Sequence, residues 1–150
     1  MNDTPELLGM IRNLSESQRL GVLATQNQGQ PYTNLIAFAA TADLKYLIFA
    51  TTRATRKYAN LMADPRVAVL VDNRKNDVAD FAEAAALTAL GKVWELHGLE
   101  RQQFLDVYLK KHPYLQEFVA APTCALLRVK VDKYIVVSRF QEVREIQMPS

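Results

Sequence analysis

Three cations, Arg53, Arg56 and Lys57, surround the start of a predicted helix, and Thr55 among them is a good N-cap. The N-terminus of a helix carries partial positive charge, so each cation placed there costs roughly 0.3–1 kcal/mol. A bound anion would offset this cost, because free backbone N–H groups and threonine hydroxyls can complete a phosphate site around it. The cluster therefore predicts a phosphorylated ligand. The alternative is a solvated helix face without a ligand.

The other reactive side chains offer little further chemistry. His97 and His112 are the only histidines, and their spacing is not that of metal ligands. Cys124 is the only cysteine, and its apolar surroundings are typical of a small core residue. No nucleophile-elbow, Walker or dinucleotide-binding motif occurs. We therefore expect no metal site, with His97 in a turn and His112 at a surface helix end.

The bulk composition is that of one globular domain over residues 1–150, with 49% apolar and 23% charged residues. A net charge of +2 and scattered basic residues do not support a nucleic-acid partner. No stretch approaches the roughly 20 apolar residues of a membrane span, and the polar start has no secretion signal. A single cysteine excludes an internal disulfide. We therefore expect a cytoplasmic protein without a membrane partner.

Turn residues divide the chain into helical and apolar extended segments. Helices are predicted from Thr4 to about Gln18, from Thr55 to Asp64, from Leu99 to Lys111 and from Tyr114 to Val119. Strands are predicted at residues 20–25, 32–40, 46–51, 66–72, from about 86 to 96, 123–137 and 141–146. The segment at 84–96 is ambiguous, since its alanines favour a helix while its later residues suit a strand with a bulge at Gly91; a strand is our prediction.

The order of these segments predicts the fold class. Strands follow one another without a continuing strand–helix–strand alternation, which argues against a doubly wound parallel sheet. We predict a mainly β protein, a six- or seven-stranded antiparallel barrel with helices at its edges.

Five short segments form an ordered set that is more specific than any one of them. They are Gly29–Leu35, Leu47–Thr51, Thr55–Lys57, Asn60–Leu61 and Asp64–Ala68. This set resembles the pyridoxamine 5′-phosphate oxidase-like split-barrel flavoproteins. The similarity runs from about residue 20 to 96, with a weaker similarity at 134–143.

The resemblance implies a split barrel in which FMN lies in a cleft between the two subunits of a homodimer. An Arg-Lys pair at a helix start holds the FMN phosphate in this family, and it matches Arg56 and Lys57. The preceding strand end supplies main chain and hydroxyls, and an earlier strand runs along the flavin ring. We add Arg53 on its charge and Trp94 as an aromatic ring that can stack. The predicted cofactor-binding residues are Asn34, Leu35, Ile36, Ala50, Thr51, Thr52, Arg53, Arg56, Lys57 and Trp94.

The chain departs from the oxidase itself in two places. Residues 84–87 are Ala-Ala-Ala-Leu, where a polar residue often reaches the flavin in the family. Residues 134–143 lack the Arg-His signature that serves the pyridoxal substrate in the oxidase. We therefore expect an FMN-dependent oxidoreductase for an unidentified small molecule other than pyridoxamine phosphate, with Tyr32, Trp94 and Phe140 lining the flavin face. The catalytic residues are not predicted.

Two other functions fit the same residues. A flavin performs the redox step itself, so a binding protein needs no visible acid–base constellation. The chain could therefore be a flavin-binding carrier or sensor without turnover. It could also be a relative of the same group that binds haem or a deazaflavin.

Overall fold

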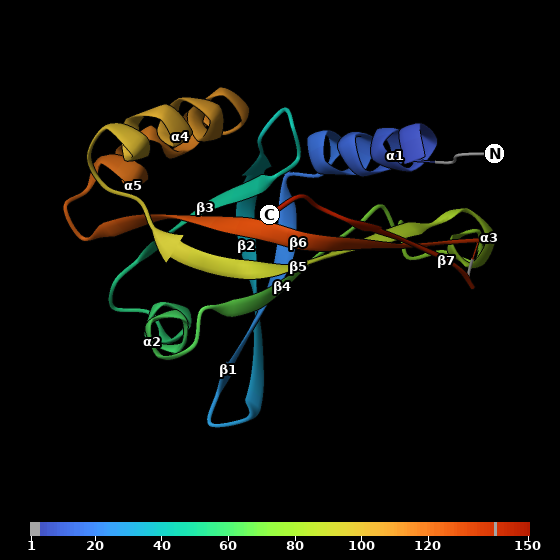
Figure 1. Ribbon diagram of the computed structural model, residues 1–150, viewed down its shortest axis with the longest axis horizontal. Coiled ribbons are helices and arrows are strands. Elements are labelled where there is room, and N and C mark those ends of the chain that lie inside the picture. The colour runs from blue at the N-terminus through green and yellow to red at the C-terminus, as the bar shows by residue number, and fades with distance from the viewer. Residues whose placement is uncertain (1–3, 140) are drawn as a thin grey trace.

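The computed structural model describes residues 4–139 and 141–150, and a closed antiparallel barrel forms its centre (Figure 1). Its described strands are β1 (Leu20–Asn27), β2 (Gln30–Ala40), β3 (Tyr46–Thr52), β4 (Arg66–Asp72), β5 (Ala85–Glu95), β6 (Cys124–Ser138) and β7 (Glu142–Gln147). They follow the order β3-β2-β1-β4-β5-β6-β7, and a further pairing of β3 with β6 closes six of them into the barrel. All these pairings are antiparallel, so the predicted fold class is confirmed.

Helices lie outside the barrel. The described ones are α1 (Thr4–Ser17), α2 (Arg56–Ala63), α3 (Asp80–Glu83), α4 (Gly98–Lys111), the 3₁₀ turn η1 (Pro113–Leu115) and α5 (Gln116–Ala120). In Figure 1, α1 and the α4–α5 pair lie above the barrel and α2 lies below it. The hairpin of β1 and β2 projects downward past α2 in the same view.

Alternation along the strands builds the barrel interior. Successive strand residues point to opposite faces, and in β1 and β4 every second residue is buried. Leu23, Phe38, Phe49, Val69 and Val129 are among the side chains that meet inside. This interior is the main hydrophobic core, and it holds the strands that carry the candidate site.

A second apolar cluster fixes α4 and α5 to the barrel. Ile48, Ala50 and Leu126 lie on the outer side of β3 and β6, and they pack with Tyr108 of α4. Cys124 is buried in this cluster, as expected for a small core residue. The outer side of β3 is therefore covered by helices, whereas the end of β3 leads into α2.

The predicted bulge at Gly91 is present. The register between β5 and β6 shifts between Leu90 and Gly91. A Cβ atom at position 91 would meet the backbone carbonyl oxygen of Lys130, so only glycine fits this close approach. The strand reading of residues 84–96 is thus confirmed, with β5 starting at Ala85.

Two local expectations differ from the structure. Helix α3 was not predicted, because four residues have no apolar periodicity; the Asp80 carboxylate organises this turn by accepting backbone N–H bonds from Lys75 and Asn76. The prediction of a surface position for His112 was wrong. This residue does end α4, but it is 5% exposed and its Nε2 atom lies 2.7 Å from the carbonyl oxygen of Phe38. Phe140, expected near the flavin, lies outside the described residues.

Candidate functional site

The start of α2 lies where the sequence predicts it. Thr55 has an extended backbone conformation, and its Oγ1 accepts a hydrogen bond from the backbone N–H of Tyr58 at 3.2 Å. The Thr51 hydroxyl at the end of β3 lies 3.0 Å from the Thr55 hydroxyl. These contacts bring two hydroxyls and the free first turn of a helix to one place.

Arg56 and Lys57 are the unpaired cations of this helix start. Neither forms an ion pair with a carboxylate in the part of the chain that the structure describes. The Arg56 guanidinium is exposed and lies 5.7 Å from the centre of the Tyr32 ring. Lys57 is half-buried, and this burial lowers the pKa of its ammonium group. Two cations without partners at the positive end of a helix favour a bound anion.

Arg53 is engaged elsewhere. Its Nη2 atom donates to Glu95 Oε2 at 2.5 Å, and its Nη1 atom donates to the Pro122 carbonyl at 2.9 Å. Tyr58 donates its hydroxyl proton to the other oxygen of Glu95 at 2.7 Å. Burial would raise the pKa of Glu95, but the hydrogen bonds from Arg53 and Tyr58 outweigh it and lower this pKa. The charge of Arg53 is therefore compensated, and Arg56 and Lys57 remain the cations of this helix start without a carboxylate partner among the described residues.

The barrel opens between β2 and β3 next to this helix start. These two strands pair with each other only from Ala40–Leu47 to Phe38–Phe49. β3 continues beyond this point, paired only with β6 through Thr52–Cys124. The predicted segments at residues 34–36 of β2 and 50–52 of β3 thus lie on the two strand edges that part here. The structure brings both segments to the same opening, and α2 follows directly from one of them.

The side chains at this opening point in different directions. Ile36 belongs to the barrel core, whereas Leu35 is 63% exposed on the outer face. The Oδ1 atom of Asn34 is buried without a hydrogen-bond partner among the described residues. Ala50 packs into the cluster under α4, so only its main chain can face the opening. Asn34 is therefore the polar side chain of β2 with a free acceptor at this place.

Trp94 lies on the opposite face of β5 from the Arg53–Glu95 pair. Strand residues alternate in direction, and Glu95 points to α2 while Trp94 packs at 4.6 Å from the Arg128 guanidinium. Tyr46 and Phe104 surround the same guanidinium. The structure therefore does not bring Trp94 and the two unpaired cations together within one chain.

Glu95 and Tyr58 were missed as members of this site. They are joined to Arg53 in a network that spans 42 positions of sequence. An acidic residue at the end of a strand carries no mark of its partner, so no local signal was available for it. A hydrogen-bonded carboxylate between an arginine and a tyrosine is visible only in the folded chain.

Among the described residues, no three His, Cys, Asp or Glu side chains gather where they could hold a metal ion. Within residues 4–139 and 141–150, no helix has both the length and the apolar character that are needed to cross a membrane.

Known structures resemble this fold at low sequence identity. A heme binding protein from Mycobacterium smegmatis matches with a TM-score of 0.80 at 15% identity, over 91% of this chain and 55% of that chain. General Stress Protein 26 from Bacillus anthracis matches with a TM-score of 0.71 at 19% identity, over 94% of this chain and 99% of that chain. A FAD-binding protein from Mesorhizobium loti matches with a TM-score of 0.69 at 19% identity, over 86% of this chain and 90% of that chain. These likenesses concern the fold, and the chain spans about half the length of the mycobacterial protein.

Sequence comparison identifies the family. No curated protein matches the chain. The model of the pyridoxamine 5′-phosphate oxidase family matches residues 7–143, which include the six barrel strands β1 to β6 and the start of β7. The chain belongs to the pyridoxamine 5′-phosphate oxidase family.

Proposed function

We propose that this protein binds FMN at the opening between β2 and β3 and acts as a flavin-dependent oxidoreductase. The observation that carries the proposal is the pair of cations at the start of α2, which have no carboxylate partner in the described residues. A phosphate monoester carries close to two negative charges near neutral pH. Arg56 and Lys57 match that charge, since Glu95 already compensates Arg53.

The surrounding residues fit the rest of the group. The Thr51 and Thr55 hydroxyls contact each other, and Thr55 also donates to the Thr52 carbonyl oxygen and accepts from the Tyr58 N–H, so they fix the first turn of α2. The free backbone N–H groups of this turn can donate to phosphate oxygens. The buried, unpartnered Oδ1 of Asn34 is an acceptor suited to an N–H group of a ligand. A bound flavin supplies the redox chemistry. The chain's own residues bind and orient it.

The substrate is proposed to be a small molecule other than pyridoxamine phosphate. That substrate carries its own phosphate, which needs cations beyond those that hold FMN. Arg53 is bound to Glu95, and Arg56 and Lys57 are assigned to the cofactor. Oxygen consumption with pyridoxamine phosphate on FMN-loaded protein should stay far below about one turnover per second. A rate at or above this value would overturn the assignment.

The cofactor test uses a ligand pair that differs only in the phosphate. The double variant Arg56→Ala/Lys57→Ala should weaken FMN binding by about two orders of magnitude or more, since charge-assisted hydrogen bonds contribute about 1.5–3 kcal/mol each. Riboflavin affinity should hardly change. The control double variant Arg19→Ala/Lys45→Ala removes two exposed cations away from α2 and should leave both affinities unchanged. Equal losses for FMN and riboflavin would contradict the phosphate assignment.

Two competing functions have distinct signatures. Haem binding is favoured by the likeness to the mycobacterial heme binding protein and needs an axial ligand such as histidine. His97 is exposed before α4 and is able to serve, whereas His112 is buried against Phe38. The absorption spectrum and mass of the copurifying molecule separate haem, deazaflavin and flavin. If a flavin is present, bleaching by NADH or NADPH indicates a reductase, and its absence indicates a carrier or sensor.

A homodimer is part of the proposal, because one outer face of the barrel is apolar. Leu35, Val22, Leu70, Thr88 and Ile135 are directly opposite one another on β2, β1, β4, β5 and β6. Their chain neighbours point into the core, so this row faces outward. This outward row is apolar except for Thr88, and such a row across five strands is suited to a twofold interface. Leu35 lies at one end of the row and beside the proposed flavin site, so a partner subunit on this face would border that site.

A further inference from the structure

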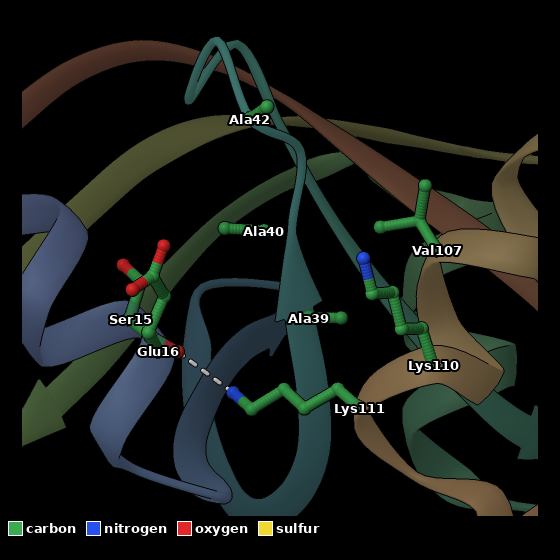
Figure 2. A pocket seen from close by; sticks show the side chains of 8 residues that line it. All are labelled: Ser15, Glu16, Ala39, Ala40, Ala42, Val107, Lys110 and Lys111. Atoms are coloured by element: carbon green, nitrogen blue, oxygen red, sulfur yellow. Dashed lines mark hydrogen bonds between the residues drawn. The ribbon is translucent and has the colours of Figure 1, made fainter.

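A cavity of about 370 Å³ lies at the other end of β2, away from α2 (Figure 2). It is bounded by the end of α1, the end of β2 with the turn that follows, and the end of α4. Its lining residues are Ser15, Glu16, Ala39, Ala40, Ala42, Val107, Lys110 and Lys111. The volume is within the range of small-molecule sites, and the residues of the proposed flavin site are not in its lining.

Lys111 gives the cavity a fixed positive charge. Its Nζ atom donates to the carbonyl oxygens of Ser15 at 2.7 Å and Gln18 at 2.6 Å, and it lies 3.9 Å from the Phe38 ring centre. These contacts hold the ammonium group in place. Lys111 forms no ion pair with a carboxylate of the described residues. Burial lowers its pKa to about 8, although the negative charge of Glu16 acts in the opposite direction. A half-buried ammonium group that no carboxylate contacts directly would be stabilised by a bound anion.

Two further polar groups of the cavity lack partners. The Oγ atom of Ser15 is buried, with the residue 1% exposed, and has no hydrogen-bond partner in the described chain. Buried hydroxyls are nearly always paired. Lys110 is exposed, and its side chain extends from α4 toward the space between the helices in Figure 2. The cavity therefore offers one free hydroxyl and one free ammonium group beside the fixed charge of Lys111.

The remaining wall is apolar. Ala39, Ala40, Ala42 and Val107 present only methyl groups, which suit a short hydrocarbon body. Glu16, exposed at the end of α1 next to Ser15, is the acidic residue of the lining, and the two lysines of the lining outnumber it. We propose that this cavity binds a small organic carboxylate, with its head between Lys110, Lys111 and the Ser15 hydroxyl and its apolar body against the alanine wall. The proposal is independent of flavin binding.

The test compares butyrate with butyramide, which has nearly the same shape but no charge. Amide NMR spectra of the full chain, recorded at constant ionic strength and pH 7, follow the signals of Ser15, Ala40 and Val107. Butyrate should shift these signals to saturation in the millimolar range, and butyramide should bind at least tenfold more weakly. The variant Lys110→Met keeps the apolar stem and should weaken butyrate binding about tenfold, without changing butyramide binding.

Two more variants sharpen the result. Ser15→Ala removes the unpartnered hydroxyl and should weaken butyrate binding severalfold. Lys92→Met removes an exposed lysine of β5 outside the cavity and should leave it unchanged. Equal binding of butyrate and butyramide would overturn the proposal. So would butyrate shifts that survive Lys110→Met or that never saturate. Because α2 takes no part in this test, its failure leaves the flavin proposal untouched.

Discussion

Glu95 sets the charge that the start of α2 offers to a ligand. Without this carboxylate, Arg53, Arg56 and Lys57 would present three cations at one helix end. With it, the Arg53 guanidinium is held between Glu95 and the Pro122 carbonyl, so two cations remain. The ligand preference of the site thus depends on a residue that need not touch the ligand.

Lys57 predicts a pH dependence of FMN affinity. Burial lowers its pKa from the ordinary value of 10.5, so the free protein loses this charge at a lower pH than an exposed lysine would. A neutral amine attracts phosphate less. FMN affinity should therefore decline as pH rises through this lowered pKa. Lys57→Arg should retain affinity there, since arginine stays charged. Parallel titrations of both proteins with FMN by fluorescence check this, and an identical decline in the two would refute it.

Glu95 predicts a pH dependence of stability. Its folded-state pKa is lowered, so its contribution is present above the unfolded value of about 4.5 and is lost as pH falls through the folded value. Glu95→Gln should lower the midpoint of thermal unfolding at pH 7 by about 3 °C. This difference from the wild type should shrink below pH 4.5. Glu117→Gln, which removes an exposed carboxylate of α5, should give no such pattern. A difference that stays constant down to pH 3 would count against the ion pair.

At the level of elements, replacing Gly91 at the bulge in β5 should lower the stability of the fold. Gly91→Ala places a methyl group against the backbone carbonyl of Lys130, and neither backbone segment can move without breaking the β5–β6 register. We expect a loss of about 3 kcal/mol in the free energy of unfolding, measured by urea denaturation. Gly9→Ala is the matched control, because a Cβ atom there meets nothing within 4 Å. Within α1, this substitution should stabilise the protein by about 0.5–1 kcal/mol. Equal changes in the free energy of unfolding for Gly91→Ala and Gly9→Ala would show that the close approach of residue 91 to Lys130 does not require glycine.

The elements with strong local signals were predictable from the sequence. Thr55 caps α2, Pro65 follows its end, and Gly91 marks the bulge, since each acts through its own backbone or immediate neighbours. Contacts between distant segments were not predictable. The Arg53–Glu95 pair and the burial of His112 against Phe38 join residues whose neighbours in sequence give no hint of the partner. The cluster of cations at the start of α2 was therefore visible in the sequence, while the division of its charge required the fold.

For the whole molecule, the outward apolar row predicts assembly. Leu35 is 63% exposed, so Leu35→Arg places a charge on this row with little loss of monomer stability. The variant should weaken dimer formation at least a hundredfold, which corresponds to roughly 3 kcal/mol. Leu99→Arg is the control, because Leu99 is 85% exposed on α4 and lies outside the row. Sedimentation velocity at micromolar concentration distinguishes the two. A wild-type monomer that still binds flavin would contradict the dimer.

The closure of the barrel has a consequence for how the protein is made. Thr52 at the end of β3 pairs with Cys124 at the start of β6, so the ring of strands cannot close until the ribosome has delivered β6. Up to that moment, a nascent chain with β1 to β5 paired exposes two free edges, β3 and β5, on a largely apolar sheet. Such edges invite pairing with other chains, and distant strand pairing is slow. The period between synthesis of β5 and of β6 is therefore when the nascent chain is most exposed to pairing with other chains.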